Sequence, residues 1–370
     1  MAEKALAATQ IGQRQIEVRE FALPEIAEDA ALLKVEVAGV CGADVHFFQE
    51  APAQPRILGH ENVGVIARIG RYASRRWGLK EGDLVALEEY LPCYYCEWCH
   101  KGEYRHCWAT DILNNPGAPR YGLTDTTYPP SLWGGYSQYL YMPHNAVWHR
   151  LPRGTAAEEA VLAVPLSNGV QWACIDGGVG VGKTILIQGP GQMGLGCVVA
   201  AKQAGADCVI VTGLSKDRWR LDVARQLGAD YMIEAGAEDV REKVAEITGG
   251  KGVDVVVDCT SGARSEPTLM ALDALRTRGG VMVLQGQEMP EFPNFPLGKL
   301  ANKYVTLKMA RGHSYAAVER ALEIIGAHRY PLHLMRTHHF DLSHVDTAIR
   351  ATGGEEIEGA VHVSVRPWAS

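Results

Sequence analysis

The spacing of hydrophobic positions changes part-way along the chain. Up to about residue 150, short stretches alternate apolar and polar residues, as at 31–37 and 62–69, and glycines and prolines separate them. Such alternation predicts half-buried β-strands. Residues 108–135 are rich in Gly, Pro, Asn and Thr and predict a long loop, of the kind that is usually functional or interfacial. The pattern indicates a β-rich first domain.

From about residue 165, short apolar runs alternate with helical stretches. Trp219, Val223 and Leu227, for example, recur at helical spacing and would share one face of a helix. Continuous apolar strands that alternate with helices are typical of a parallel sheet covered on both faces. The expected strands lie at 185–188, 208–212, 253–257 and 281–284.

We therefore predict an α/β protein built from three segments. A β-rich domain covers residues 1–164, a doubly wound parallel sheet covers 165–310, and residues 311–370 return to the first domain. The return is expected because a helical stretch is followed by a short strand-like run at 360–365.

Composition and charge exclude several classes of protein. The chain has 370 residues, 47% of them hydrophobic and 21% charged, so it can bury a large core and is not intrinsically disordered. With 36 Lys and Arg against 43 Asp and Glu, the net charge is −7, which disfavours a nucleic acid as partner. The sequence contains no run of 18 apolar residues that would predict a membrane span, and residues 1–10 lack a secretory signal. We expect a cytoplasmic protein.

Nine cysteines in such a chain favour metal binding or burial over a disulfide framework. Four of them follow the spacing C-x2-C-x2-C-x7-C, and four thiolates on one short lobe match tetrahedral Zn²⁺ with no open coordination position. An iron–sulfur cluster is the alternative, but no second cysteine set supports it. The predicted structural zinc ligands are Cys93, Cys96, Cys99 and Cys107.

A glycine-rich turn follows the first expected strand of the α/β segment. Residues 189–194 read Gly-Pro-Gly-Gln-Met-Gly and precede a helical stretch, which is the G-x-G-x-x-G pattern between strand and helix. The first glycine permits the turn, the second lets the backbone approach a pyrophosphate, and the third lets helix and strand pack closely. The helix N-terminus then faces the anion. The predicted dinucleotide-binding residues are Gly189, Gly191, Gln192, Met193 and Gly194.

The ribose of the cofactor is expected at the end of the next strand, about 20 residues after the glycines. An acidic residue there would bind a free 2′-hydroxyl, but the sequence has Gly213. The missing carboxylate also removes the repulsion against a 2′-phosphate, which Ser215, Lys216 and Arg218 could hold. The two basic residues could equally be surface charges at a helix start. We expect NADP(H) or NAD(H), with a modest preference for NADP(H).

Two further segments carry groups that bind metals. One contains Cys41, Asp44 and His46, and the other contains His60 and Glu61. A thiolate, an imidazole and a carboxylate from separate loops could form an open zinc site, in which the metal polarises a carbonyl. Each segment alone is a weak signal, because single cysteines are more often buried than reactive.

Together these motifs resemble the zinc-containing medium-chain dehydrogenase/reductase family, the group of alcohol, sorbitol and threonine dehydrogenases. The resemblance covers nearly the whole chain in order: C-G-x-D-x-H at 41–46, G-H-E-x-x-G at 59–64, the four-cysteine lobe at 93–107, the stretch 134–139 and the nucleotide motif at 189–194. It implies a GroES-like β-rich catalytic domain with an inserted Rossmann domain and an active site in the cleft between them. It also implies hydride transfer between a nicotinamide and an alcohol or carbonyl carbon, usually by a homodimer or homotetramer.

The resemblance also implies roles for individual residues. By position, Cys41 and His60 would ligate a catalytic zinc, and Glu61 would lie behind the metal or ligate it. Asp44 would orient a ligand histidine. His46 would be the far end of a proton relay. The expected substrate is a small alcohol, carbonyl or enone.

Two positions depart from the family pattern. Ala43 stands where members carry the Ser or Thr that passes on the substrate proton, and Val164 stands where a third protein ligand is expected. Zinc could still bind through Cys41, His60 and Glu61 with water and serve an alcohol dehydrogenase or ketone reductase. Alternatively, this zinc is absent and the site reduces an activated C=C bond, with water or a side chain as proton donor. A third outcome is a nucleotide-binding relative without catalysis.

Overall fold

The computed structural model describes residues 3–112, 114–260, 265–285, 292, 295–355 and 357–369. It divides into two compact units, each described by itself below. The first comprises Met1–Ala163, Ile325–Ala327 and Arg336–Ser370, and the second comprises Val164–Ile324 and His328–Met335. The chain thus returns for good to the first unit at Arg336, later than the expected residue 311.

The late return has a packing reason. Within the second unit, the Trp172 indole N–H donates a hydrogen bond to the carbonyl of Gly312 at 3.1 Å. The Ser314 hydroxyl donates to the side-chain oxygen of Gln171 at 2.8 Å. Trp172, Gln171 and Ser314 are buried, and these two bonds fix the start of the last long helix to the second unit.

The first unit is rich in β-structure, as predicted. Its larger sheet contains the two expected strands, which pair antiparallel from Ala31 against Ile69 to Gly39 against Glu61. In order, this sheet consists of β15 (Arg336–Phe340), β16 (His362–Val365), β3 (Ala31–Gly39), β5 (Glu61–Ile69), β6 (Leu84–Leu87) and β8 (Trp148–Arg150), with β7 (Tyr139–Met142) paired to β3. A smaller sheet consists of β2 (Gln15–Ala22), β1 (Lys4–Gly12) and β4 (Arg56–Ile57).

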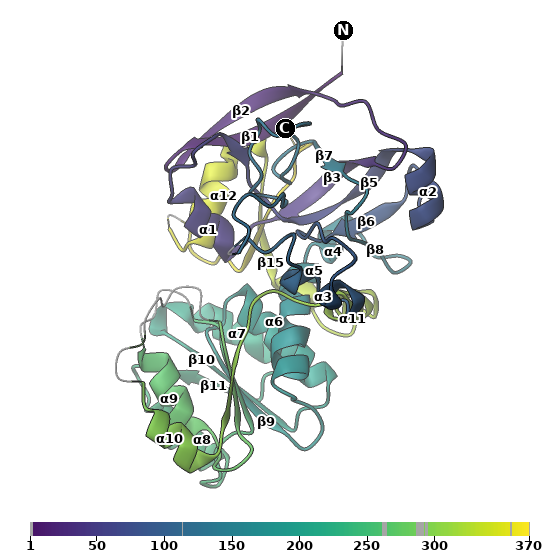
Figure 1. Ribbon diagram of the computed structural model, residues 1–370. Coiled ribbons are helices and arrows are strands. Elements are labelled where there is room, and N and C mark those ends of the chain that lie inside the picture. The colour runs from purple at the N-terminus through teal and green to yellow at the C-terminus, as the bar shows by residue number, and fades with distance from the viewer. Residues whose placement is uncertain are drawn as a thin grey trace. The chain divides into compact units, whose positions relative to one another are not determined.

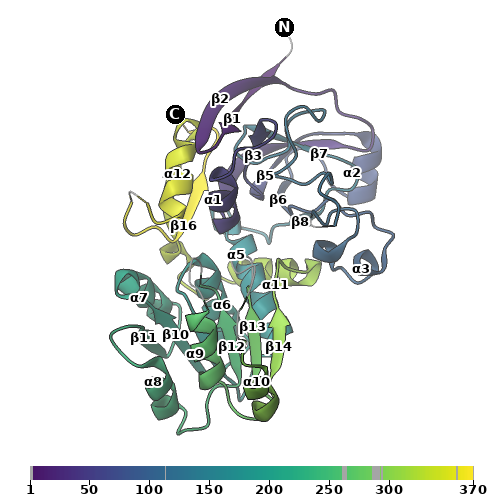
Figure 2. The same cartoon turned by 60° about the vertical axis from the view of Figure 1, so that its left-hand side comes forward.

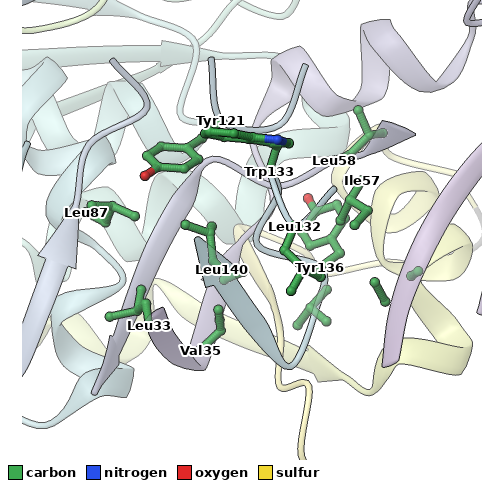
Figure 3. Packing of buried hydrophobic residues seen from close by; sticks show 14 of the residues in the cluster. Leu33, Val35, Ile57, Leu58, Leu87, Tyr121, Leu132, Trp133, Tyr136 and Leu140 are labelled. Carbon is green, nitrogen blue, oxygen red and sulfur yellow. The ribbon is translucent and has the colours of Figure 1, made fainter. Parts of the chain in front are cut away.

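Short helices complete this unit, and the predicted long loop has a buried interior. Described residues between Cys107 and Tyr139 contain no helix or regular strand, yet Tyr121 and Trp133 are buried with ring centroids 6.1 Å apart. Figure 3 shows both rings beside apolar side chains of β3, β6 and β7. The helices are α1 (Gly42–Phe48), α2 (Arg71–Trp77), α3 (Glu97–His100), η1 (Tyr104–His106), α4 (Ala157–Ala160), η5 (Leu342–His344) and α12 (Val345–Thr352).

The second unit contains the predicted parallel sheet, in which all strand pairs are parallel. Its strand order is β11 (Tyr231–Glu234), β10 (Cys208–Gly213), β9 (Thr184–Gln188), β12 (Val255–Asp258), β13 (Val281–Leu284) and β14 (Thr306–Met309). The order reverses direction at β9, so the carboxyl end of β9 is the switch point where ligands of such sheets bind. Figure 2 shows β12, β13 and β14 side by side in this sheet.

Helices cover both faces of the parallel sheet, as the unbroken apolar strands predict. In Figure 1, α8, α9 and α10 lie on one side of the sheet and α6 on the other. None of the described helices is long and apolar enough to cross a membrane. The helices are α5 (Ala163–Gly169), the π-helical η2 (Val170–Asp176), α6 (Gln192–Gln203), η3 (Ser215–Asp217), α7 (Arg218–Gln226), α8 (Val240–Ile247), α9 (Glu266–Ala274), α10 (Leu297–Lys303), α11 (Tyr315–Gly326) and η4 (Leu332–Leu334).

Candidate active site and metal centres

Three residues from the two predicted metal-binding segments come together in the first unit. One ligand atom each of Cys41, His60 and Glu61 lies within 4.8 Å of the others. Cys41 follows β3 and caps the N-terminus of α1, whereas Glu61 is the first residue of β5. The antiparallel pairing of Gly39 with Glu61 brings these two chain segments side by side.

A buried carboxylate holds this group in place. Asp44 is fully buried and accepts hydrogen bonds from the Cys41 backbone N–H at 2.9 Å and from the Gly59 backbone N–H at 3.3 Å. It also accepts from the Tyr136 hydroxyl at 3.0 Å, and its Oδ1 lies 3.4 Å from Nδ1 of His60. One carboxylate therefore fixes the backbone of both segments and the orientation of the His60 ring.

The electrostatics of the group follow from its burial and its acidic neighbours. Burial is the largest single effect and disfavours a charged imidazole. Attraction and hydrogen bonding to Asp44, with smaller contributions from Cys41 and Glu89, together outweigh it and raise the pKa of His60 well above its usual value. Burial, followed by repulsion from Glu61, raises the pKa of the Cys41 thiol to about 11. Without a cation, a thiolate beside this carboxylate is thus unfavourable.

The Glu61 carboxylate is buried without enough protein partners. Its side chain is fully buried, and neither carboxylate oxygen has a hydrogen bond. The nearest ring is that of His362, with Nε2 at 3.4 Å from Oε2, and both ring nitrogens of His362 also lack hydrogen bonds. Both side chains meet above Gly39, where a Cβ atom would press against each of them. A buried carboxylate left in this state fits the coordination of a cation such as Zn²⁺.

His46, the predicted end of a proton relay, lies outside this group. Its side chain is 69% exposed, and its Nε2 lies 3.2 Å from the carboxylate of Glu50, which follows the C-terminal end of α1. Ala43 lies in α1 directly before Asp44. Val164 is half-buried in α5, and its carbonyl accepts a hydrogen bond from the Ser167 hydroxyl at 2.9 Å.

The four predicted structural ligands form the second metal-binding group of the described residues. One sulfur atom of each lies within 4.8 Å of the other three. Sγ of Cys99 is 3.5 Å from that of Cys96 and 3.9 Å from that of Cys93. Cys107 is buried, and its sulfur accepts the backbone N–H of Cys93 at 3.2 Å. Four converging thiols fit a closed, tetrahedral zinc site.

The glycine-rich turn in the second unit has the geometry that a pyrophosphate requires. It connects β9 to α6, with Gly189 in the left-handed region at φ +88°. A Cβ atom on Gly194 would overlap the carbonyl oxygen of Gly189, whereas one on Gly191 would meet nothing within 4 Å. Gln192 and Met193 begin α6, and the Met193 sulfur accepts a hydrogen bond from the Asn168 side chain at 3.3 Å. The space beside Gly191, at the N-terminus of α6, is thus open on the side where a helix end favours an anion.

The expected phosphate-binding residues contact a carboxylate that the sequence did not reveal. Gly213, the last residue of β10, pairs in register with Glu234, the last residue of β11. The Arg218 guanidinium donates to both Glu234 oxygens, at 2.7 and 3.1 Å, and the Ser215 hydroxyl donates to one of them. Lys216 is exposed. Two of the three polar side chains are thus already bound to an acid.

Known protein families and relatives match most of the chain. The model of the alcohol dehydrogenase GroES-like domain matches residues 27–153, and that of the zinc-binding dehydrogenase matches residues 193–327. A probable alcohol dehydrogenase from Mycobacterium tuberculosis is 35% identical over 323 residues, which cover 86% of each chain. The chain belongs to the zinc-containing medium-chain dehydrogenase/reductase family. It is an oxidoreductase with a GroES-like unit and a Rossmann unit, as the motifs predicted.

Two further similar proteins match this dehydrogenase over nearly its full length. A sorbitol dehydrogenase from Halalkalibacterium halodurans is 30% identical over 359 residues, which cover 96% of this chain and 98% of the relative. The crystal structure of an alcohol dehydrogenase from Thermotoga maritima superposes with a TM-score of 0.85 at 26% identity and covers 99% of this chain and all of that one.

Three contacts at the candidate sites were not predicted from the sequence. Tyr136 lies in the stretch 134–139, for which the sequence predicts no individual contact, yet its hydroxyl donates a hydrogen bond to Asp44. His362 and Glu234 were not considered, because each reaches its site through strand pairing. A charged residue at the carboxyl end of the strand beside the ribose strand is a signal that could have revealed Glu234.

Proposed function

We propose that this dehydrogenase transfers hydride between NAD(P)(H) and a small alcohol or carbonyl compound at an open zinc site. The observation that supports this proposal is the convergence of Cys41, His60 and Glu61, with two buried carboxylate oxygens that lack hydrogen bonds. When bound, zinc polarises the carbonyl as a Lewis acid and the nicotinamide supplies or accepts the hydride. Cys93, Cys96, Cys99 and Cys107 would hold a second, structural zinc.

The residues of the chain have separate tasks in this reaction. Cys41, His60 and Glu61 hold the metal, and Glu61 takes the place of the ligand that Val164 cannot provide. Asp44 orients His60 and is itself held by Tyr136. Since Ala43 has no exchangeable proton, the substrate proton passes to water, and His46 is the exposed imidazole at the end of that route.

The cofactor proposal is finer than the family membership. The turn at Gly189, Gly191 and Gly194, with Gln192 and Met193, would bind the pyrophosphate. Gly213 puts no charge against a 2′-phosphate, which favours NADP(H) over NAD(H) by a small factor. We propose that both nucleotides bind, that the enzyme is cytoplasmic, and that it acts as a homodimer or homotetramer.

A substrate panel tests the reaction class. The protein is assayed with NADPH and NADH against ketones, aldehydes and enones, and with NADP⁺ and NAD⁺ against secondary alcohols and polyols. We expect turnover of C=O and alcohol substrates that is lost after the metal is removed by a chelator and restored by Zn²⁺. Metal-independent reduction of enones alone would instead support the C=C alternative to which Ala43 and Val164 point.

A further inference from the structure

The end of β10 cannot carry the acidic residue expected there, for a steric reason. A Cβ atom on Gly213 would lie 2.9 Å from the Pro190 ring and 3.2 Å from Cβ of Asp217. The proline ring belongs to the glycine-rich turn and cannot rotate away. Any side chain at position 213 would therefore displace the turn that is proposed to hold the pyrophosphate.

A carboxylate from the neighbouring strand lies beside this gap. Glu234 pairs in register with Gly213, and its side chain is 17% exposed. Its oxygens accept bonds from Ser215 and from the bidentate Arg218, so these side chains converge on the end of β10. Two other acids lie nearby: Asp217 accepts the Leu214 backbone N–H at 3.1 Å, and Glu238 accepts the Glu234 backbone N–H at 3.3 Å.

We propose that Glu234 determines cofactor specificity by competing with the ribose 2′-phosphate of NADP(H) for Arg218 and Ser215. This inference rests on the proposed nucleotide site. A phosphate at this position must displace the carboxylate from both donors and then lie close to its negative charge. A 2′-hydroxyl has no charge to be repelled and can donate to the carboxylate. Gly213 permits a preference for NADP(H), and Glu234 limits the size of that preference.

The charge state of the pair agrees with this role. Hydrogen bonds from Arg218 and Ser215 lower the pKa of Glu234, so the carboxylate is ionised at neutral pH. The Arg218 side chain is 72% exposed, so it has room to move from the carboxylate to a phosphate. Its long, flexible stem lets it change partner without movement of the backbone.

Binding measurements with NADPH and NADH test the proposal. Glu234→Gln removes the charge and keeps the size of the side chain. Glu238→Gln, the control, removes a neighbouring negative charge instead, and the glutamine oxygen can still accept the Glu234 backbone N–H that Glu238 accepts at 3.3 Å. We expect the ratio of the NADH Kd to the NADPH Kd to rise about tenfold in Glu234→Gln. In Glu238→Gln it should stay at the wild-type value. Adding Arg218→Gln to Glu234→Gln should remove the gain in NADPH affinity.

The possible results separate this inference from the proposed function. A ratio in Glu234→Gln within twofold of the wild type, with both nucleotides bound, would overturn the role of Glu234 alone. An equal rise in Glu238→Gln would also overturn it, because the effect would then be one of overall charge. If the wild type binds neither nucleotide, the proposed function itself fails.

Discussion

Asp44 holds the segments of the predicted metal site together, although it is not itself one of the predicted ligands. Its carboxylate accepts from two backbone N–H groups and from Tyr136, and it faces His60. It is fully buried, so its charge acts at close range on all of them. The site therefore depends on one side chain that holds its ligands in position.

Replacing this carboxylate tests its positioning role. We expect Asp44→Asn to keep the fold but to weaken Zn²⁺ binding at Cys41, His60 and Glu61 by about 10–100-fold, the usual cost of losing an outer partner of a metal ligand. Competition with a chelator measures that affinity directly. The control is Glu50→Gln, which removes an exposed acid of the first unit whose carboxylate lies 3.2 Å from Nε2 of His46. Wild-type affinity in Asp44→Asn would show that the carboxylate does not orient the ligands.

At the scale of residues, the sequence predicts which side chains could bind the metal but not which other side chains contact them. Cys41, His60 and Glu61 lie in short motifs and could be recognised there. The contact between Glu61 and His362 arises because β3 lies between β5 and β16 and has glycine at the crossing point. No local pattern encodes that meeting of residues about 300 positions apart along the chain.

At the scale of elements, the turn between β9 and α6 uses its glycines for different purposes. Gly194 is required by packing, because a Cβ atom there would overlap the Gly189 carbonyl. Gly191 has open space around its Cα, so a side chain there would meet only a ligand. The strand, turn and helix could be predicted from sequence because all three signals are local.

Two alanine variants separate these purposes. Gly191→Ala should keep the melting temperature of the nucleotide-free protein within about 2 °C and weaken both NADPH and NADH by about tenfold or more, since the methyl group occupies the space of the pyrophosphate. Gly194→Ala should lower the melting temperature itself, because the helix must move away from the strand. Thermal unfolding with and without nucleotide measures both effects. Equal behaviour of the two variants would contradict the assignment.

Element boundaries were harder to predict than element types. The apolar runs predicted the central strands of the second unit because burial on both faces demands such runs. The place of α11 in the second unit could not be predicted, since it depends on hydrogen bonds of Trp172 and Gln171 with residues 312 and 314, which precede this helix. The π-helical turn at Val170–Asp176 likewise has no signal in the hydrophobic pattern.

At the scale of the whole molecule, the described residues contain two groups that could hold a metal, and their designs differ. Cys93, Cys96, Cys99 and Cys107 would surround a zinc ion on all sides, whereas Cys41, His60 and Glu61 would leave one coordination position for water or substrate. The alternative without an active-site zinc predicts that only the four-cysteine group binds metal. The two accounts thus predict different numbers of zinc ions per chain.

The zinc content of the purified full-length protein, measured by mass spectrometry of the metal, is the most direct test. We expect the two groups to give about two zinc ions per chain in the wild type and about one in His60→Ala, in which the four-cysteine group is intact. About one zinc ion in both proteins would show that Cys41, His60 and Glu61 do not hold a metal and would contradict the proposed mechanism.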